Sequence, residues 1–504
     1  MTIHLSILLF WPLALGLVAG LLPRGLAGAV GLGGALVPLA YTVIILLDFQ
    51  TGRAGLQYVT NDTWIEDLGI RYQLGVDGLN LWLVALTTLL FTMAAVWIMV
   101  RPPESRPRLF AFYMGLAETA VLGAFLAQDL ILFVLFFDLM LVPFYFLVGQ
   151  WGIGPDRVAA TFKLVVYTLV GSLLMLAAAV ATGVLAGAGP DGAVSFSFAA
   201  LARSPVSEPT QKWLFAAFAL AFLIKMPAFP FHGWMPDGYR TMPLPVLAVF
   251  SGVLSKVAAY GFLRVVLPIF PDATQSLDIV VLLVALASIL YGSVLAFTQT
   301  NGRLILGYSS MAQLGFITLG IFALGQTAGA QGSLLQMVNH GLVVAPLFFI
   351  VALLSERASG SEDIADMGGI AFRAPVLAAL FLIVALATLA MPGSANFVGE
   401  FLILLGVFNA KLAIALIAST GVILASVYML RMYIRSMHNR TGEKVTSYEI
   451  SASEGLVLVP LVLCIIAFAL YPQQALKHSE PTVKRVVAAA SPNTSAVAQR
   501  GVTP

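Results

Sequence analysis

Long apolar stretches recur along the whole chain, and each is long enough to cross a lipid bilayer as a helix. Hydrophobic residues make up 60% of the 504 residues and charged residues only 10%, whereas a soluble domain has about 45–50% and about 25%. A transmembrane helix needs about 20 apolar residues, so the pattern predicts an all-α polytopic membrane protein with about 14 spans. The expected spans are residues 4–22, 27–47, 78–100, 109–127, 130–149, 162–187, 212–231, 242–268, 277–298, 304–324, 331–354, 375–406, 410–432 and 454–472.

The remaining composition excludes several classes of site. The net charge of +2 provides no basic field, so no nucleic-acid partner is expected. Cys464 is the single cysteine, which rules out an internal disulfide and a cysteine-clustered zinc or iron–sulfur site. No phosphate-binding glycine loop is evident, and the histidines lack metal-ligand spacing. We therefore expect no cofactor, redox centre or metal in this chain. The five histidines are His4, His232, His340, His438 and His478.

Basic residues of the short loops predict the orientation of the chain. Alternate loops carry them, which assigns that side to the cytoplasm. Both termini then lie outside, and the polar tail 473–504 is expected to be flexible. The basic residues of these loops are Arg24, Arg101, Arg106, Arg108, Arg157, Arg240, Arg303, Arg357, Arg373, Arg435, Arg440 and Lys444.

Six ionisable residues fall well inside the expected spans. A charge near the bilayer centre costs from about 2.5 kcal/mol upward, so each is a functional candidate. A single buried lysine–acid pair can also be structural, since polar groups join membrane helices. Six such groups in one chain favour function. They are Glu118, Asp138, Lys225, Lys256, His340 and Glu400.

Two of the expected spans are interrupted close to one of these charges. Pro227 follows Lys225, and Pro392-Gly393 precedes Glu400. Proline removes a backbone donor, so both helices should break, and the freed carbonyls must face protein or water. Breaks in the seventh and twelfth spans lie five spans apart, which predicts two inverted five-helix repeats. The expected division is 1–108 for helices one to three, 109–268 and 269–432 for the repeats, and 433–504 for the last helix and tail.

Several motifs resemble the antiporter-like subunits of respiratory complex I, and the resemblance covers nearly the whole chain. Within that family, the M-type is favoured by the absence of a long lateral C-terminal helix and by Glu400, where the L-type usually has lysine. Sodium/proton antiporter and membrane-bound hydrogenase subunits share most of the motifs. The matching segments are 75–79, 136–147, 225–237, 254–261, 308–316, 339–341 and 396–401.

The resemblance implies proton translocation driven by redox chemistry in other subunits. Lys225 is the expected central switch with Asp138 as its partner, Lys256 and His340 are relays, and Glu400 leads to the exit. Further candidates are Glu118, His232, Asp237 and Gln313. NADH, FMN, iron–sulfur clusters and quinone are expected in partner subunits of a bacterial cytoplasmic-membrane complex, next to other antiporter-like subunits and lipid.

The sequence departs from the family pattern at three places. Asp138 replaces the usual glutamate, and its side chain is one methylene shorter. Gln313 stands where a histidine is usual, and glutamine can relay hydrogen bonds but cannot titrate. Arg303-Leu304 replaces a lysine–arginine pair. These differences affect the expected proton path near the tenth span.

Two other functions stay open. The chain can serve a multi-chain sodium/proton antiporter or a membrane-bound hydrogenase complex, which the co-purifying subunits would reveal. It can also be an inert scaffold, in which case neutralising Lys225, Lys256 and Glu400 together leaves transport intact.

Overall fold

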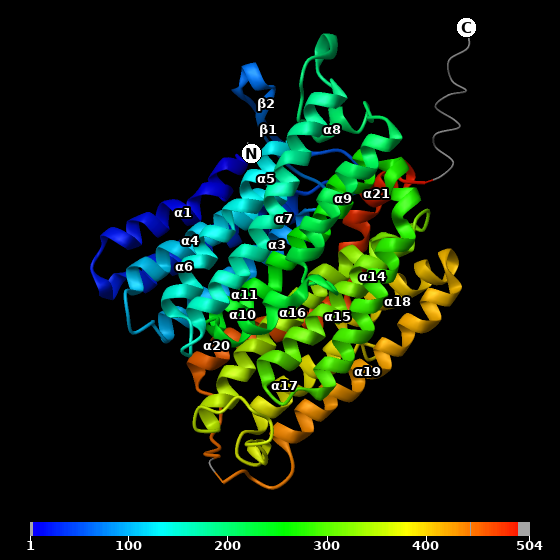
Figure 1. The fold of residues 1–504 in the computed structure, drawn as a ribbon. Helices are drawn as coiled ribbons and strands as arrows, with labels where there is room; N and C mark the ends of the chain where they lie inside the picture. The colour runs from blue at the N-terminus through cyan, green and yellow to red at the C-terminus, as the bar shows by residue number, and fades with distance from the viewer. Residues whose placement is uncertain (1–3, 444, 492–504) are drawn as a thin grey trace.

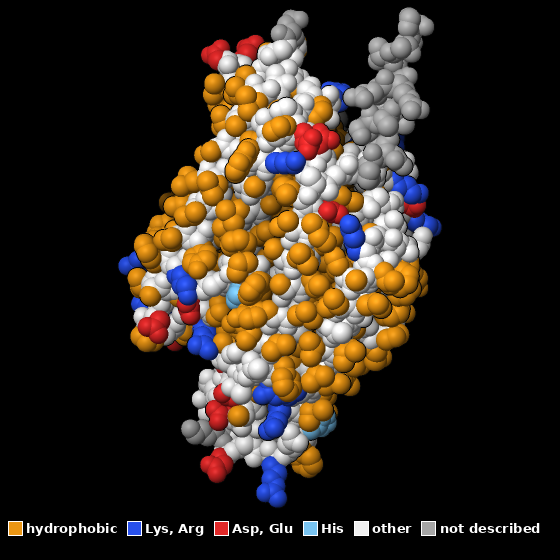
Figure 2. All heavy atoms as spheres, turned by 45° about the vertical axis from the view of Figure 1, so that its right-hand side comes forward, with side chains coloured by type: hydrophobic (Ala, Val, Ile, Leu, Met, Phe, Trp, Pro, Cys, Tyr) orange, Lys and Arg blue, Asp and Glu red, His pale blue; other side chains and the backbone are white. Residues whose placement is uncertain are grey.

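The computed structural model describes residues 4–443 and 445–491, and they form a bundle of packed helices (Figure 1). Within these residues, 11 helices are long and apolar enough to cross a membrane, and three shorter apolar helices join them. Hydrophobic side chains cover the middle of the face seen in Figure 2, and most charged groups lie toward its two ends. Lys444 and residues 492–504 lie outside the described residues, and the orientation of the chain stays a prediction.

Most of the expected spans correspond to single helices or to pairs of helices in the structure, and the eighth is divided further. The elements of the first half are α1 (Leu5–Leu21), α2 (Ala27–Asp48), β1 (Gln57–Ile65), β2 (Ile70–Val76), α3 (Leu81–Val100), α4 (Pro107–Leu126), α5 (Leu130–Leu139), α6 (Leu141–Trp151), α7 (Arg157–Ala186), α8 (Phe198–Leu201) and α9 (Glu208–Lys225). Those of the second half are α10 (Met235–Thr241), α11 (Leu244–Val249), α12 (Ser255–Gly261), α13 (Leu267–Ile269), α14 (Pro271–Thr298), α15 (Gly302–Ile321), α16 (Thr327–Arg357), α17 (Pro375–Thr388), α18 (Ala395–Ala410), α19 (Leu412–Met437), α20 (Ala452–Leu470) and α21 (Pro472–Ala489).

Both predicted helix breaks are present. Helix α9 ends at Lys225, and a non-helical turn with Pro227 leads to the short 3-10 helix η4 (Phe231–Trp234). Helix α17 ends at Thr388, and α18 begins only at Ala395. The proline rings explain both interruptions, because neither Pro227 nor Pro392 can donate the backbone hydrogen bond that a continuous helix needs.

The fifth and eighth spans are less regular than the sequence predicted. The fifth is divided at Met140 into α5 and α6. Pro143 cannot donate to the carbonyl four residues earlier, which accounts for the irregularity directly after Asp138. The eighth span runs from α11 to α13 through two π-helical turns, η5 (Phe250–Leu254) and η6 (Phe262–Val266).

The bundle has a buried central layer. Every residue is buried in the most apolar part of α15, of α16 and of the 244–269 segment. In the corresponding parts of α2, α7, α19 and α20, fewer than half of the residues are buried. Helix α16 contacts α3, α11, α15, α17, α18, α20 and α21. Polar groups on this central layer are therefore shielded from lipid by the surrounding helices.

At one end of the bundle, β1 and β2 form an antiparallel hairpin that packs on the helix ends. Asp129 fixes it there: its Oδ2 accepts the backbone N–H of Arg71, and its Oδ1 accepts those of Ile131 and Leu132. Burial raises the pKa of the Asp129 carboxyl to about 6, although these backbone donors oppose the shift.

The expectation of a flexible tail from residue 473 is wrong over residues 473–489. These residues belong to α21, which packs against α16 and α13. Its buried side chains recur at helical spacing, so the helix is amphipathic although its composition is polar. A count of polar residues does not reveal this stripe of buried side chains. The stripe consists of Ala475, Ser479, Thr482, Val483, Val486 and Val487.

Candidate functional site

Lys225 and Asp138 lie at the two helix irregularities of the first half. Lys225 is the last residue of α9 and only 7% exposed. Its Nζ donates to the Phe137 carbonyl at 3.2 Å and lies 4.5 Å from the centre of the Phe137 ring. Lys225 thus contacts the residue next to Asp138 on the chain, but no direct ion pair joins Lys225 and Asp138 among the described residues. One carboxylate oxygen of Asp138 is buried, and the described residues offer it no partner.

Lys256 follows the first π-helical turn of the eighth span. It is completely buried, and its Nζ donates to the Ser251 carbonyl at 2.5 Å. A π-turn displaces backbone carbonyls from the regular helical ladder, which is why such turns often occur at functional sites. Sequence reasoning identified Lys256 but not the turn that presents an acceptor to it.

His340 lies in the middle of α16, which packs against η5 and against α12, the helix that carries Lys256. It is 2% exposed, and its Nδ1 has no hydrogen-bond partner among the described residues. The next residue, Gly341, packs directly on the π-turn: a Cβ atom there would lie 2.7 Å from the Gly252 carbonyl oxygen. Glycine at this position therefore allows α16 to approach η5 and holds His340 beside Lys256.

Glu400 is bound by two glutamine side chains from neighbouring helices. Its Oε1 accepts Nε2 of Gln313 on α15 at 2.8 Å and Nε2 of Gln336 on α16 at 3.3 Å. The same Gln336 nitrogen also donates to Oε1 of Gln313 at 2.8 Å. Gln313, which replaces the usual histidine, thus contacts the acid directly, whereas the role of Gln336 was missed from the sequence.

Facing surfaces of α16 and α18 carry unpaired polar atoms between His340 and Glu400. Asn396 is completely buried, and within the part of the chain that the structure describes neither its side-chain oxygen nor its nitrogen has a partner. The same is true of Oδ1 of Asn339 and Oε1 of Gln336. Buried polar atoms are normally hydrogen-bonded, and ordered water is the usual partner where protein groups are absent. The sequence contains a signal for these facing surfaces. Residues 336, 339 and 340 of α16 have the same spacing as residues 396, 399 and 400 of α18, and this spacing places each set on one face of its helix.

Three of the expected candidates lie away from these groups. We call the buried groups the row, and its members are Asp138, Lys225, Lys256, His340, Asn396 and Glu400. Glu118 on α4 borders a separate cavity between α1, α2, α3 and α4, and its Oε1 has no partner. The His232 ring packs on Phe229 and Tyr291. Asp237 pairs with Lys163 at 2.7 Å beside an open cavity near the N-terminus of α7.

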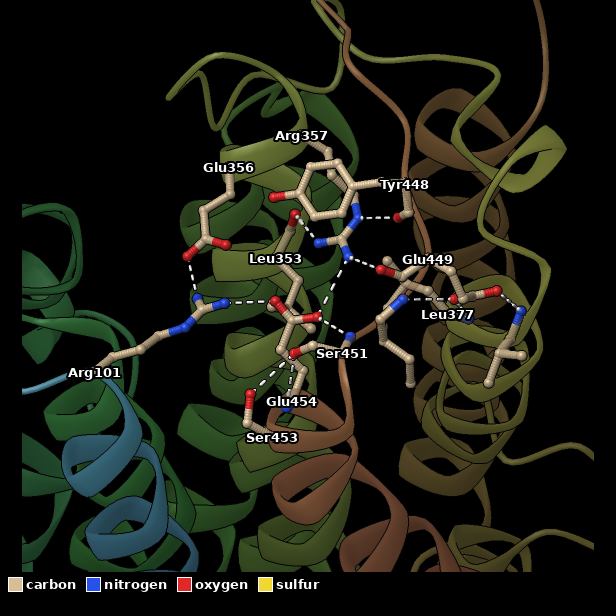
Figure 3. Close-up of polar contacts among 12 residues, drawn as sticks. Arg101, Leu353, Glu356, Arg357, Leu377, Tyr448, Glu449, Ser451, Ser453 and Glu454 are labelled. Carbon is tan, nitrogen blue, oxygen red and sulfur yellow. Dashed lines mark hydrogen bonds and ion pairs between the residues drawn. The ribbon is translucent and has the colours of Figure 1, made fainter.

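A second polar network joins four helices near the end of the bundle opposite the hairpin (Figure 3). Glu454 of α20 accepts Nη2 of Arg101 at 2.5 Å and Nη2 of Arg357 at 3.4 Å, and Arg101 also pairs with Glu356. The completely buried Arg357 further donates to the carbonyls of Tyr448 and Glu449. We call Arg101, Glu356, Arg357 and Glu454 the clamp. The sequence had assigned its arginines only to orientation.

The fold and the buried charges define a class of protein. A helical membrane bundle with two broken helices, and with buried lysine, histidine and carboxylate groups on or against its shielded central layer, is an antiporter-like membrane subunit. The family model for NADH:quinone oxidoreductase and Mrp antiporter membrane subunits matches residues 127–425, which is more than half of the chain.

Curated relatives and solved structures agree with this class. NADH-quinone oxidoreductase subunit M of Rhodobacter capsulatus is 34% identical over 500 residues, covering 96% of both chains. The Mycobacterium tuberculosis protein of the same name is 34% identical over 519 residues, covering 96% of this chain and 94% of the relative. A chain of respiratory complex I from Thermus thermophilus has a TM-score of 0.88 at 29% identity over 97% of this chain and all of its own. The chain belongs to the NADH-quinone oxidoreductase subunit M family.

The Mrp complex from Dietzia sp. DQ12-45-1b contains a chain of the same fold. That chain has a TM-score of 0.83 at 21% identity, covering 98% of both chains. At this identity the match concerns the fold alone.

Proposed function

We propose that this chain is the proton-translocating subunit M of a bacterial NADH-quinone oxidoreductase, embedded in the inner membrane. The observation that carries the proposal is a set of buried ionisable groups in a fold shared with that family. They lie on the central layer or on helices packed against it, and they are Lys225, Lys256, His340 and Glu400. The complex transfers electrons from NADH to quinone, and this chain contributes the membrane path for protons.

The finer parts of the proposal concern sites and partners. NADH, FMN, iron–sulfur clusters and quinone would be held by partner subunits, and this chain would have no catalytic centre of its own. Other antiporter-like subunits would be its neighbours in the membrane, and both termini would lie on the periplasmic side. The loop arginines support that orientation.

In the proposed mechanism, the distance between Asp138 and Lys225 controls the proton on the lysine. Two opposite unit charges 4 Å apart attract by about 4 kcal/mol at an effective dielectric of 20. Such an energy changes proton affinity about a thousandfold. The lysine now donates to the carbonyl of Phe137, the residue next to Asp138, so a small movement suffices to form or break the ion pair.

From Lys225 the proton would pass to Lys256 and His340, and then to Glu400. Neither Asn339 nor Asn396 titrates, so both would act only by holding water between His340 and Glu400. Glu118, His232 and Asp237 lie off this row and would serve entry or structure rather than the central relay.

Replacement of Lys225 by alanine in the assembled complex tests the proposal. We expect proton translocation into inverted vesicles to fall at least tenfold per quinone reduced, because the switching charge is gone. The matched control is Lys212→Ala on the same helix, since Lys212 is exposed and, among the described residues, forms an ion pair only with Glu208 one turn away. Normal pumping in the Lys225 variant would exclude the central role of this lysine.

The second candidate function is ion antiport without redox chemistry. The fold shared with the chain of the Mrp complex supports this candidate. Mass spectrometry of the purified complex separates the two. Flavin and iron–sulfur subunits are expected with a quinone reductase, whereas small membrane subunits alone would identify an antiporter.

A further inference from the structure

A cavity at the hairpin end of the bundle brings together three arginines from separate parts of the chain. Arg203 follows α8, Arg264 lies in the π-turn η6, and Arg485 lies on α21, and all three line the same cavity. Helix α21 packs against α13, which directly follows η6, and the segment around α8 completes the wall of the cavity. None of these arginines belongs to the proposed proton path.

The charges of this cavity are not balanced by the protein. Arg264 is 7% exposed, and its Nη2 pairs with Asp77 at 2.5 Å while its Nε donates to the Tyr260 hydroxyl at 2.8 Å. For Arg203 and Arg485, the described residues supply no side-chain partner. Three guanidinium groups and one carboxylate leave a net charge of +2. Like charges in a partly enclosed cavity repel each other, so an anion would stabilise this arrangement.

The chemistry of the lining narrows the class of anion. Arginine presents a planar set of donors that matches phosphate oxygens in a bidentate manner. The other walls are largely apolar and include Leu56, Phe198, Pro268 and Val486. A wall of this kind suits an alkyl chain better than a small hydrated ion. Gln73 also lines the cavity, and its buried Oε1 lacks a donor, which a headgroup hydroxyl can supply.

We propose that this cavity binds the phosphate of an anionic phospholipid of the phosphatidylglycerol type. Arg203 and Arg485 hold the phosphate at the rim, Arg264 forms the positively charged floor, and the apolar wall receives the start of the acyl chains. The lipid would fasten α21 to the eighth span and to the segment after α8. This inference is independent of the proposed proton path.

The test uses the whole purified complex, stripped of lipid in detergent and titrated separately with phosphatidylglycerol, phosphatidylcholine and inorganic phosphate. We expect saturable binding of phosphatidylglycerol, measured by native mass spectrometry, and at least tenfold weaker binding in Arg203→Gln/Arg485→Gln. The control Lys477→Gln/Lys484→Gln removes the same number of positive charges from α21, outside the cavity, and should bind as the unmodified complex does. The NADH oxidation rate of each variant verifies assembly.

Each remaining outcome overturns the proposal. Equal weakening in both double variants would mean diffuse attraction to a basic surface rather than a site. Saturation by inorganic phosphate without preference for lipid would identify a free anion as the ligand. Absence of saturable binding in the unmodified complex would mean that the cavity is filled by another subunit.

Discussion

The row of buried ionisable groups and the clamp are both made of charged side chains in a membrane protein, but they are paired in opposite ways. In the clamp, Arg357 and Glu454 satisfy each other and the surrounding backbone, and Glu454 also closes a capping box with Ser451 at the start of α20. In the row, His340, Asn396 and Asp138 keep atoms without partners. Saturated pairs fix a geometry, whereas unsaturated groups can change partners at low cost.

Removal of one charge from the clamp should have the largest effect on stability. Glu454→Gln leaves the buried Arg357 without its counter-charge, and breaking a buried pair typically costs about 3–5 kcal/mol. We expect a lower yield of assembled complex and a lower melting temperature, measured by fluorescence during heating. Glu356→Gln is the control, because Glu356 is 41% exposed and exposed pairs contribute at most about 1 kcal/mol. Pumping per assembled complex should remain normal in both variants.

Removal of a charge from the pair Asp138 and Lys225 should affect pumping rather than stability. Asp138→Asn removes the charge that acts on Lys225, so we expect pumping to fall about tenfold while the melting temperature changes little. The measurement is the ratio of protons moved to quinone reduced. Glu104→Gln, at an exposed position between α3 and α4, serves as the comparison. Equal effects of the two substitutions would favour a structural role for the lysine–acid pair.

Substitution of Gln313 tests whether Glu400 needs a hydrogen-bond donor at this position and whether that donor can be a group that titrates. Gln313→Leu deprives Glu400 of its 2.8 Å donor, and a buried polar group left without its partner costs about 1–3 kcal/mol. We expect a severalfold decrease in pumping. Gln313→His keeps a donor and restores the usual family residue, so it should pump like the unmodified chain. A defect in the histidine variant would show that this chain needs a group that does not titrate.

The smallest change in stability is expected when Asn396 is replaced by leucine. Replacement of Asn80 by leucine is the matched control. Both side chains are completely buried. Asn396 has no protein partner, whereas Asn80 donates to Gly75 and Phe125 and accepts the N–H of Asp77.

Asn396→Leu should therefore change stability by less than about 1 kcal/mol, while Asn80→Leu leaves partners unsatisfied at a cost of about 1–3 kcal/mol for each group. Melting curves compare the two. A large destabilisation at Asn396 would mean that the row is as tightly paired as the clamp. Reduced pumping in the stable Asn396 variant would support water between His340 and Glu400.

The sequence alone determined the membrane class, the apolar stretches that form helices, both proline breaks and the positions of the buried charges. Each of these depends on a local property, namely the length of an apolar stretch, the missing N–H of proline or the cost of a charge in lipid. The amphipathic stripe of α21 was also present in the sequence but was hidden by its polar composition.

Only the tertiary structure decided which charged groups became paired. Arg101, Arg357 and Glu454 are more than 90 positions apart in each pairing, and nothing local distinguishes them from other loop charges. The π-turn beside Lys256, the contact of Gln336 with Glu400 and the three-arginine cavity likewise depend on how distant helices pack. The physical reason is that a hydrogen bond or ion pair requires a distance of a few ångströms, and folding sets that distance between residues that the sequence keeps far apart.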